Sequence, residues 1–338
     1  MTHYAQKGVT VIPVSGGIDS LILADANPEA TLVFVRYGQP YLDQEQRAVY
    51  RLYGDRVRFV DVGGVDTSRE YVPARNLIIA CIAAQFGDTI LIGGLADDNA
   101  ADQSTKAAEE MSTILSNQCG YQVSVSMPLS EYCKAEAVSF YLNEPETIEG
   151  SLLKMSRIRA TFSCYAEDSA SDFCGDCSAC FRRSTALLAN GVDVQMPHDR
   201  IVLEYMQKLH NYHPDRVWAI FKALQLDGRV LLCVDIDGVL TVETSGRNYS
   251  ARTPRKSAID NLRMHVDSGA LVVLYTARPS WDRAETVDWL QKNGVPFHSL
   301  FMGKFPALKY IDDLSLTDIP GPTDSALMNP PIYEGQNP

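Results

Sequence analysis

The chain has 338 residues, of which 46% are hydrophobic and 21% are charged, and this length exceeds what one hydrophobic core usually serves, so two domains are expected. A formal net charge of −12 at pH 7 disfavours broad nucleic-acid binding, and no local basic patch offsets it. The first residues lack the features of a secretion signal, and no apolar run reaches membrane-spanning length, so we expect a cytoplasmic protein without a membrane partner.

Short apolar runs alternate with helical patterns over the first 200 residues. Such alternation is typical of an α/β fold in which right-handed crossovers connect a doubly wound, mostly parallel sheet. The pattern predicts strands at residues 9–14, 31–36, 58–62 and 89–93, and helices at 43–53, 76–85 and 104–116.

The rest of the chain predicts helices at 182–189 and 198–224, then strands at 229–235, 271–276 and 297–301. The polar stretch 211–215 introduces turns within the second of these helices. We therefore expect a first domain at 1–205, a helical linker at 206–228, a smaller α/β domain at 229–318 and a loose proline-rich tail at 319–338.

A glycine-rich loop follows the first predicted strand and precedes a helix expected to open at Leu21. Backbone N–H groups at the start of a helix, together with the helix dipole, favour a bound anion. The lysine of the ordinary P-loop is absent, and a plain turn that uses glycine for its conformational freedom is the alternative interpretation. The loop reads Ser15-Gly16-Gly17-Ile18-Asp19-Ser20.

Four of the eight cysteines lie close together, at Cys164, Cys174, Cys177 and Cys180. Disulfides are rare in a reducing compartment, and this spacing favours a metal. Four thiolates complete the tetrahedral shell of Zn²⁺ and leave no position for water, which predicts a structural site. An iron–sulfur cluster and four unrelated buried thiols remain as alternatives.

Two carboxylates, Asp235 and Asp237, stand at the end of a predicted buried strand in the pattern D-x-D-G-x-L. This arrangement suits phosphoryl transfer, because one carboxylate can attack phosphorus while the other handles a proton and Mg²⁺ screens their charge.

The loop S-G-G-x-D-S resembles that of the N-type ATP pyrophosphatases, also called PP-loop enzymes. Together with the cysteine cluster, the chain over residues 9–190 resembles one family among them, the 7-cyano-7-deazaguanine synthases of queuosine and 7-deazaguanine biosynthesis. Further matching pieces are residues 71–76, residues 90–93, Pro128-Leu129, Lys134, Glu136 and the stretch 163–183.

This resemblance implies an ATP-dependent ligase. The carboxylate of 7-carboxy-7-deazaguanine would attack the α-phosphate of ATP, ammonia would displace AMP, and a second ATP would drive dehydration to the nitrile. Arg75 and Lys134 would supply positive charge, and Asn76 would orient the nucleotide. The pyrophosphate and its Mg²⁺ would be held by Ser15, Gly16, Gly17, Ile18, Asp19 and Ser20. The family often forms homodimers, so a homodimer is an open expectation.

Two departures from the family stand out. Ala74 replaces a usual glycine, and residues 97–104 replace a tyrosine-proline-aspartate-cysteine-arginine run, of which only Asp102 keeps a matching type. The second departure leaves ATP activation in place and opens the identity of the acceptor. Family members in antiphage-defence gene clusters make an amine on a protein the alternative to ammonia.

The second domain resembles the haloacid-dehalogenase-like (HAD) phosphohydrolases. By that resemblance Asp235 is the nucleophile and Asp237 the acid and base, Thr276 and Lys304 bind the phosphoryl group, and Asp312 or Asp313 completes a Mg²⁺ site. A degenerate domain kept for packing is the alternative. A further hypothesis makes the whole chain a phosphatase whose N-terminal domain only binds a nucleotide.

Overall fold

The computed structural model describes residues 7–67, 72–98, 101–143, 147–166, 172–242 and 248–304. The chain divides into two compact units. The first comprises residues up to Tyr205 together with 211–228, and the second comprises 206–210 together with the residues from Arg229 onward. We describe each unit separately. The identities assigned above to the domains stay predictions.

The first unit is built on a parallel sheet of five strands in the order β3-β2-β1-β4-β5. The apolar runs Val11–Ile12 and Leu32–Val35 are buried, as expected for central strands covered on both faces. The strands are β1 (Thr10–Pro13), β2 (Thr31–Arg36), β3 (Val57–Asp61), β4 (Thr89–Leu91) and β5 (Ser124–Ser126).

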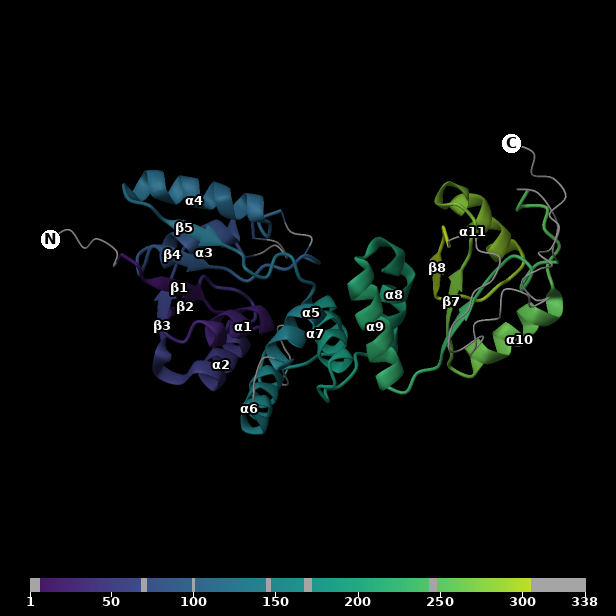
Figure 1. Cartoon of the computed structure of the whole chain (residues 1–338), viewed down its shortest axis with the longest axis horizontal. Helices are drawn as coiled ribbons and strands as arrows, with labels where there is room; N and C mark the ends of the chain where they lie inside the picture. The colour runs from purple at the N-terminus through teal and green to yellow at the C-terminus, as the bar shows by residue number, and fades with distance from the viewer. Residues whose placement is uncertain are drawn as a thin grey trace, which may run out of the picture. The chain divides into compact units, whose positions relative to one another are not determined.

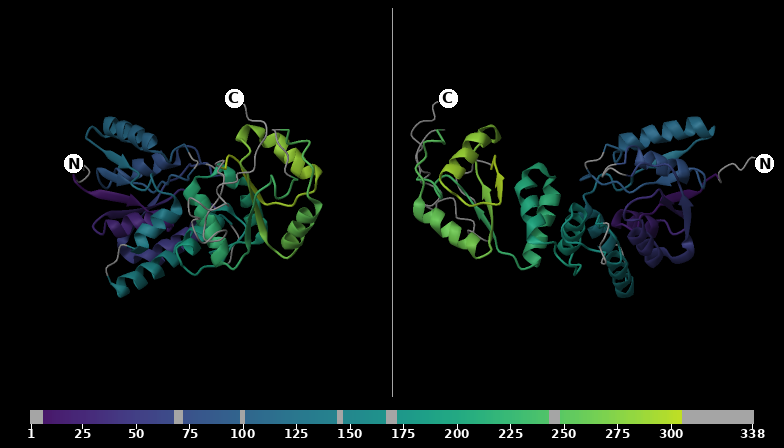
Figure 2. Two further views of the ribbon diagram at one scale, coloured as in Figure 1. Left: turned by 45° about the vertical axis from the view of Figure 1, so that its right-hand side comes forward. Right: turned by 180° about the vertical axis from the view of Figure 1, so that it is seen from behind.

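Helices cover both faces of this sheet. Two of them, α3 (Arg75–Ala83) and α4 (Thr105–Cys119), contribute small and apolar side chains to the core on one face, against strand residues such as Val33 and Ile90. Figures 1 and 2 show α1 (Ile18–Ala26) and α2 (Leu42–Tyr53) on the opposite side of the strands from α4. The doubly wound α/β fold is thereby confirmed for this unit.

Five further helices follow the sheet: α5 (Lys134–Asn143), α6 (Ile148–Arg159), α7 (Ser178–Ala189), α8 (Asp199–Lys208) and α9 (Pro214–Leu226). The sequence predicts one interrupted helix over 198–224, whereas the structure has α8, a 3₁₀ turn at Leu209–Asn211 and a separate α9. Pro214 occupies the first turn of α9, where its missing N–H costs nothing. Helix α9 packs mainly against α7.

The second unit contains a parallel sheet of three described strands, β6 (Leu231–Val234), β7 (Leu271–Tyr275) and β8 (Ser299–Phe301), in that order. Its core joins these strands to α10 (Lys256–Asp267) and α11 (Arg283–Lys292), which follows a 3₁₀ turn at Ser280–Asp282. Trp289 and Leu290 of α11 are almost fully buried in this core.

None of the helices in the described part of the chain combines the length and the apolar character that crossing a bilayer requires.

Candidate active site

The strand order of the first unit reverses between β1 and β4. Ligands of open α/β sheets bind beyond the carboxyl ends of the strands at such a reversal. The loop 15–20 follows β1 and Gly93 follows β4, and the two segments touch there. A Cβ atom on Gly93 would lie 2.9 Å from the Cβ of Asp19, so this close approach needs glycine.

The loop 15–20 is held in a defined conformation. Gly16 has a φ of 73°, and a Cβ there would lie 2.8 Å from the Cβ of Ala48 in α2. The Ser20 hydroxyl donates to the carbonyl of Gly17 at 3.1 Å and accepts from the N–H of Ser15 at 3.4 Å. Helix α1 begins at Ile18, three residues before the predicted start, so its first N–H groups belong to the loop itself.

A cavity of about 220 Å³ opens over this loop. Positively charged side chains from three helices line it: Arg75 at the start of α3, Lys134 at the start of α5, and Arg182 and Arg183 in α7. Oriented N–H groups and several cations in one cavity form a site suited to phosphate and carboxylate groups.

Two of these cations have carboxylate partners, and a third has none among the described residues. The Lys134 ammonium lies 2.9 and 3.0 Å from the two carboxylate oxygens of Asp19. Arg182 pairs with Asp98. Burial alone would raise the pKa of Asp98, but the positive charges of Arg182 and Lys134 hold this pKa below its usual value. Arg75 forms no ion pair with a carboxylate among the described residues, and its side chain is hydrogen-bonded to Tyr37.

The wall beside Arg75 is aromatic and carries one acid. Tyr37, Tyr41 and Tyr165 line the cavity, and the rings of Tyr41 and Tyr165 lie 5.3 Å apart at an interplanar angle of 32°. Glu45 of α2 lines the same wall, and its carboxylate accepts a hydrogen bond of 2.8 Å from the side chain of Gln39.

Helix α3 enters the site through a strained residue. Ala74 has a φ of 57°, and it is the one non-glycine residue in the described ranges with a positive φ. A left-handed conformation costs an L-residue roughly 1–2 kcal/mol. The glycine usual in related synthases would avoid this strain. Asn76 is buried two residues later, and its side-chain amide donates to the carbonyl of Asp102 at 3.1 Å.

Residues 97–104 are the segment that departs from the family, and two of its described residues, Asp97 and Asp98, form ion pairs. Asp97 is buried, lies 3.9 Å from Arg182 and 3.7 Å from Arg216 of α9, and accepts from the backbone N–H of Lys134 at 3.2 Å. Asp97 and Asp98 therefore position cations of the cavity wall. Residues 99 and 100 of this segment lie outside the described ranges.

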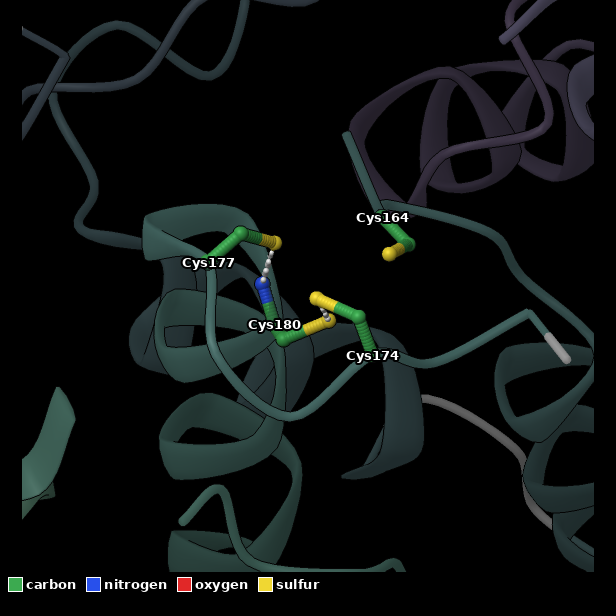
Figure 3. A group of neighbouring side chains, drawn as sticks. All are labelled: Cys164, Cys174, Cys177 and Cys180. Atoms are coloured by element: carbon green, nitrogen blue, oxygen red, sulfur yellow. Dashed lines mark hydrogen bonds between the residues drawn. The ribbon is translucent and has the colours of Figure 1, made fainter. Parts of the chain in front are cut away.

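The four cysteines gather into one cluster, with all four sulfur atoms within 4.8 Å of one another. Figure 3 shows Cys164 approaching from a separate segment while the other three come from the turn before α7 and its first residues. The sulfurs of Cys174 and Cys180 are 3.9 Å apart. Tetrahedral Zn–S bonds of about 2.3 Å imply sulfur separations near 3.8 Å, so the donor set fits Zn²⁺.

The cluster supports the cavity. Phe162, two residues before Cys164, donates its N–H to the carbonyl of Gly16 at 2.8 Å. The backbone N–H of Cys180 donates to the sulfur of Cys177, which caps α7 just before the two arginines of the cavity. A metal at this point would fix both the loop 15–20 and the start of α7.

The second unit has its own group of charges beyond β6 and β7. Lys304 lies 3.1 Å from an oxygen of Asp235. Arg278, only 1% exposed, forms two hydrogen bonds of 2.8 Å with the carboxylate of Asp237. The buried Thr276 lies beside both basic residues. Its hydroxyl accepts a hydrogen bond of 3.3 Å from the backbone N–H of Arg278, and its carbonyl accepts one of 2.9 Å from the backbone N–H of Lys304. Asp312 and Asp313 lie outside the described residues.

Comparisons with known proteins address the first unit most clearly. Residues 55–191 match the family described as queuosine biosynthesis protein QueC. This range contains Arg75, Lys134 and the four cysteines. It begins after the loop 15–20.

Over residues 55–191 the first unit is similar to the QueC family. A 7-cyano-7-deazaguanine synthase from Xylella fastidiosa (strain M12) is 28% identical over 223 residues, covering 54% of this chain and 91% of its own. One from Methanopyrus kandleri is 25% identical over 229 residues, covering 54% of this chain and 96% of its own. The expected relationship to these synthases is thus confirmed for the N-terminal half.

Two further matches are a family match in the second unit and a solved structure. Residues 232–310 match the family described as PITM 1-3, LNS2 domain. Among solved structures, the crystal structure of an MCSG target from Vibrio cholerae is 28% identical and covers 26% of this chain and 82% of that chain, with a TM-score of 0.22.

The structure brings the site residues predicted in the first unit to one cavity. The cavity is lined by Arg75, Asn76, Lys134 and the loop 15–20 without Gly16. Gly16 packs against Ala48 of α2 instead. Sequence reasoning missed Arg182, Arg183, Gln39 and Glu45. The paired arginines directly after the fourth cysteine were a usable signal, because a metal cluster fixes the start of the helix that carries them.

Proposed function

We propose that the first unit is an ATP-dependent ligase that adenylates the carboxylate of 7-carboxy-7-deazaguanine and transfers the acyl group to an amine. The observation that carries the proposal is the single cavity in which the loop 15–20, Lys134 and Arg75 meet, where Arg75 has no carboxylate ion pair among the described residues. The QueC family domain supports this choice over other anions.

In this proposal the substrate carboxylate attacks the α-phosphorus of ATP, and the bond to the oxygen that bridges the α- and β-phosphates breaks. Pyrophosphate leaves into the loop, whose N–H groups donate hydrogen bonds to its oxygens, and Arg75 orients the incoming carboxylate. The amine nitrogen then attacks the acyl carbon, AMP leaves, and the nitrogen loses a proton. With ammonia the product is an amide, which a second ATP converts to the nitrile.

Asp19 is the loop carboxylate that would hold Mg²⁺, since this ion prefers oxygen ligands and arrives with the nucleotide phosphates. The ion would offset the negative charge of the phosphates. The Lys134 ammonium pairs with the Asp19 carboxylate. It would turn to a phosphate when Asp19 binds a cation.

The test incubates the protein with ATP and 7-carboxy-7-deazaguanine and measures AMP and pyrophosphate. Asp19→Ala and Lys134→Met should each reduce AMP release by at least about 100-fold, because each removes a charge that acts on the phosphates. Asp43→Asn is the control, since Asp43 is exposed on α2 and does not line the cavity. Unchanged AMP release in both variants would contradict the proposal.

The acceptor is tested in the same reaction. Ammonia is the acceptor of the synthase reaction, and the altered segment at 97–104 supports an amine on a protein as the alternative. Mass spectrometry of reactions with ammonia, or with a peptide amine, distinguishes the nitrile from an acylated peptide. Rapid nitrile formation would exclude the protein acceptor.

For the second unit we propose a HAD-type, Mg²⁺-dependent phosphohydrolase with Asp235 as nucleophile. The pairing of Asp235 with Lys304, beside Thr276, supports a site for a phosphoryl group. Both oxygens of Asp237 are engaged by Arg278, so Asp237 can act as acid and base only if these bonds loosen. The wild type should hydrolyse a phosphate monoester, and Asp235→Asn should abolish this hydrolysis.

A further inference from the structure

Glu45 is a feature of the cavity that phosphate and carboxylate binding leave unexplained. It is an acid in the wall of a site that otherwise gathers cations. Burial raises the pKa of Glu45 to about 7, against the lowering influence of the Gln39 hydrogen bond and the charge of Arg75. The Gln39 bond is its one side-chain hydrogen bond in the described residues, where no cation pairs with it.

Glu45 is half-buried, and a desolvated carboxylate without an ion pair destabilises a fold. Such a cost is typical of residues retained for a ligand. The surroundings of Glu45 suit a flat ligand, because Tyr37, Tyr41 and Tyr165 line the same wall and offer aromatic faces. Gln39 holds one carboxylate oxygen in place, which leaves the second oxygen and the remaining lone pair for the ligand.

The chemistry of a carboxylate selects among heterocycles. An ionised carboxylate only accepts hydrogen bonds, so it pairs with two adjacent N–H groups. A 2-amino-6-oxo-pyrimidine ring, as in guanine and 7-deazaguanine, offers this pair. A 6-amino ring, as in adenine, presents one donor and one acceptor, and it pairs with a side-chain amide instead.

We propose that Glu45 is the specificity-determining residue for the base, and that its carboxylate binds the adjacent ring N–H and 2-amino groups of a 7-deazaguanine substrate. This inference rests on the proposed function. It adds to that function a division of the cavity, in which Arg75 and the loop 15–20 bind anionic groups and Glu45 with the tyrosines binds the base.

The test compares Glu45→Gln with the wild type and with Asp43→Asn, an exposed acid on the same helix. Calorimetry measures the affinity for 7-carboxy-7-deazaguanine, for its 6-amino analogue without the 2-amino group, and for ATP. We expect Glu45→Gln to bind the deazaguanine acid about 10- to 100-fold more weakly, as follows from the loss of a charged acceptor. Binding of the 6-amino analogue should stay equal or strengthen, and ATP binding should not change.

The outcomes separate the two proposals. If Glu45→Gln binds the deazaguanine acid as tightly as the wild type, the role of Glu45 is wrong, whatever the turnover. If it weakens ATP instead, Glu45 serves the adenine and the inference is overturned as well. If the wild type binds the acid through Glu45 but releases no AMP, the ligase proposal fails alone. If the wild type binds no deazaguanine acid, both fail. Glu45→Ala, with thermal unfolding as a check of folding, should show the same loss for the acid without any gain for the analogue.

Discussion

Glu45 links the proton equilibrium of the cavity to the stability of the fold. In the unfolded chain a glutamate titrates near pH 4.3, whereas burial raises the pKa of Glu45 to about 7. Between these values the folded state keeps a proton that the unfolded state has released. The stability that depends on Glu45 is therefore highest at low pH and is lost as the pH rises from about 4.3 to about 7. Gln39, Arg75, Tyr37 and Tyr41 interact with this group, and Tyr165 lies beside Tyr41.

This linkage predicts the effect of Glu45→Gln on stability. At pH 8 the variant should be more stable than the wild type, by on the order of 1–3 kcal/mol, because it no longer buries a charge. At pH 5 the difference should nearly vanish. Urea unfolding at both pH values measures it. An equal difference at both would show that Glu45 does not titrate in this range.

At the scale of residues, the sequence predicted the parts of the site that follow one another in the chain. The loop 15–20 and the cysteines are such parts. It could not predict Glu45, because a glutamate in an amphipathic helix is normally on the solvent-facing side, and only the packing of α2 against the loop turns it toward the cavity. The departure at Ala74 is a small chemical change, yet the structure places it at a left-handed φ, where an added methyl group causes strain.

At the scale of elements, prediction succeeded where burial shaped the sequence. The strand predicted at 31–36 coincides with β2, and the other three strands predicted in the first 200 residues agree within two residues at each end. β5 was missed because Ser124-Val125-Ser126 contains a single apolar residue, and its place is set by pairing with β4. α5 and α6 were missed as well.

The cysteine cluster allows a prediction for α7. Removal of Zn²⁺ by a chelator, or the change Cys177→Ser, should release the start of this helix and with it Arg182 and Arg183. We expect about one Zn²⁺ per chain in the wild type, little or none in the variant, and a melting temperature lower by several degrees. Metal analysis and thermal unfolding measure both effects. Cys81→Ser is the control, because Cys81 is exposed on α3 and not part of the cluster. Iron with sulfide in place of zinc would contradict the zinc assignment.

At the scale of the whole molecule, the chain holds two separate candidate sites, one in each unit. If the units act independently, Asp235→Asn should abolish phosphate-monoester hydrolysis and leave AMP release within about twofold of the wild type. Asp19→Ala should do the opposite. Measuring both activities on both variants checks this. Loss of both activities in either variant would show that the reactions are coupled.

The charge of the cavity differs in sign from that of the chain. Two acids, Asp19 and Glu45, and four bases, Arg75, Lys134, Arg182 and Arg183, line the cavity, while the chain as a whole carries a net charge of −12. A long polyanion meets the repulsion of the whole surface before any part of it can enter. A small anion that diffuses within a Debye length, about 8 Å at physiological salt, is exposed mainly to the local positive field. The side chains that line the cavity therefore favour a small anion over a long polyanion.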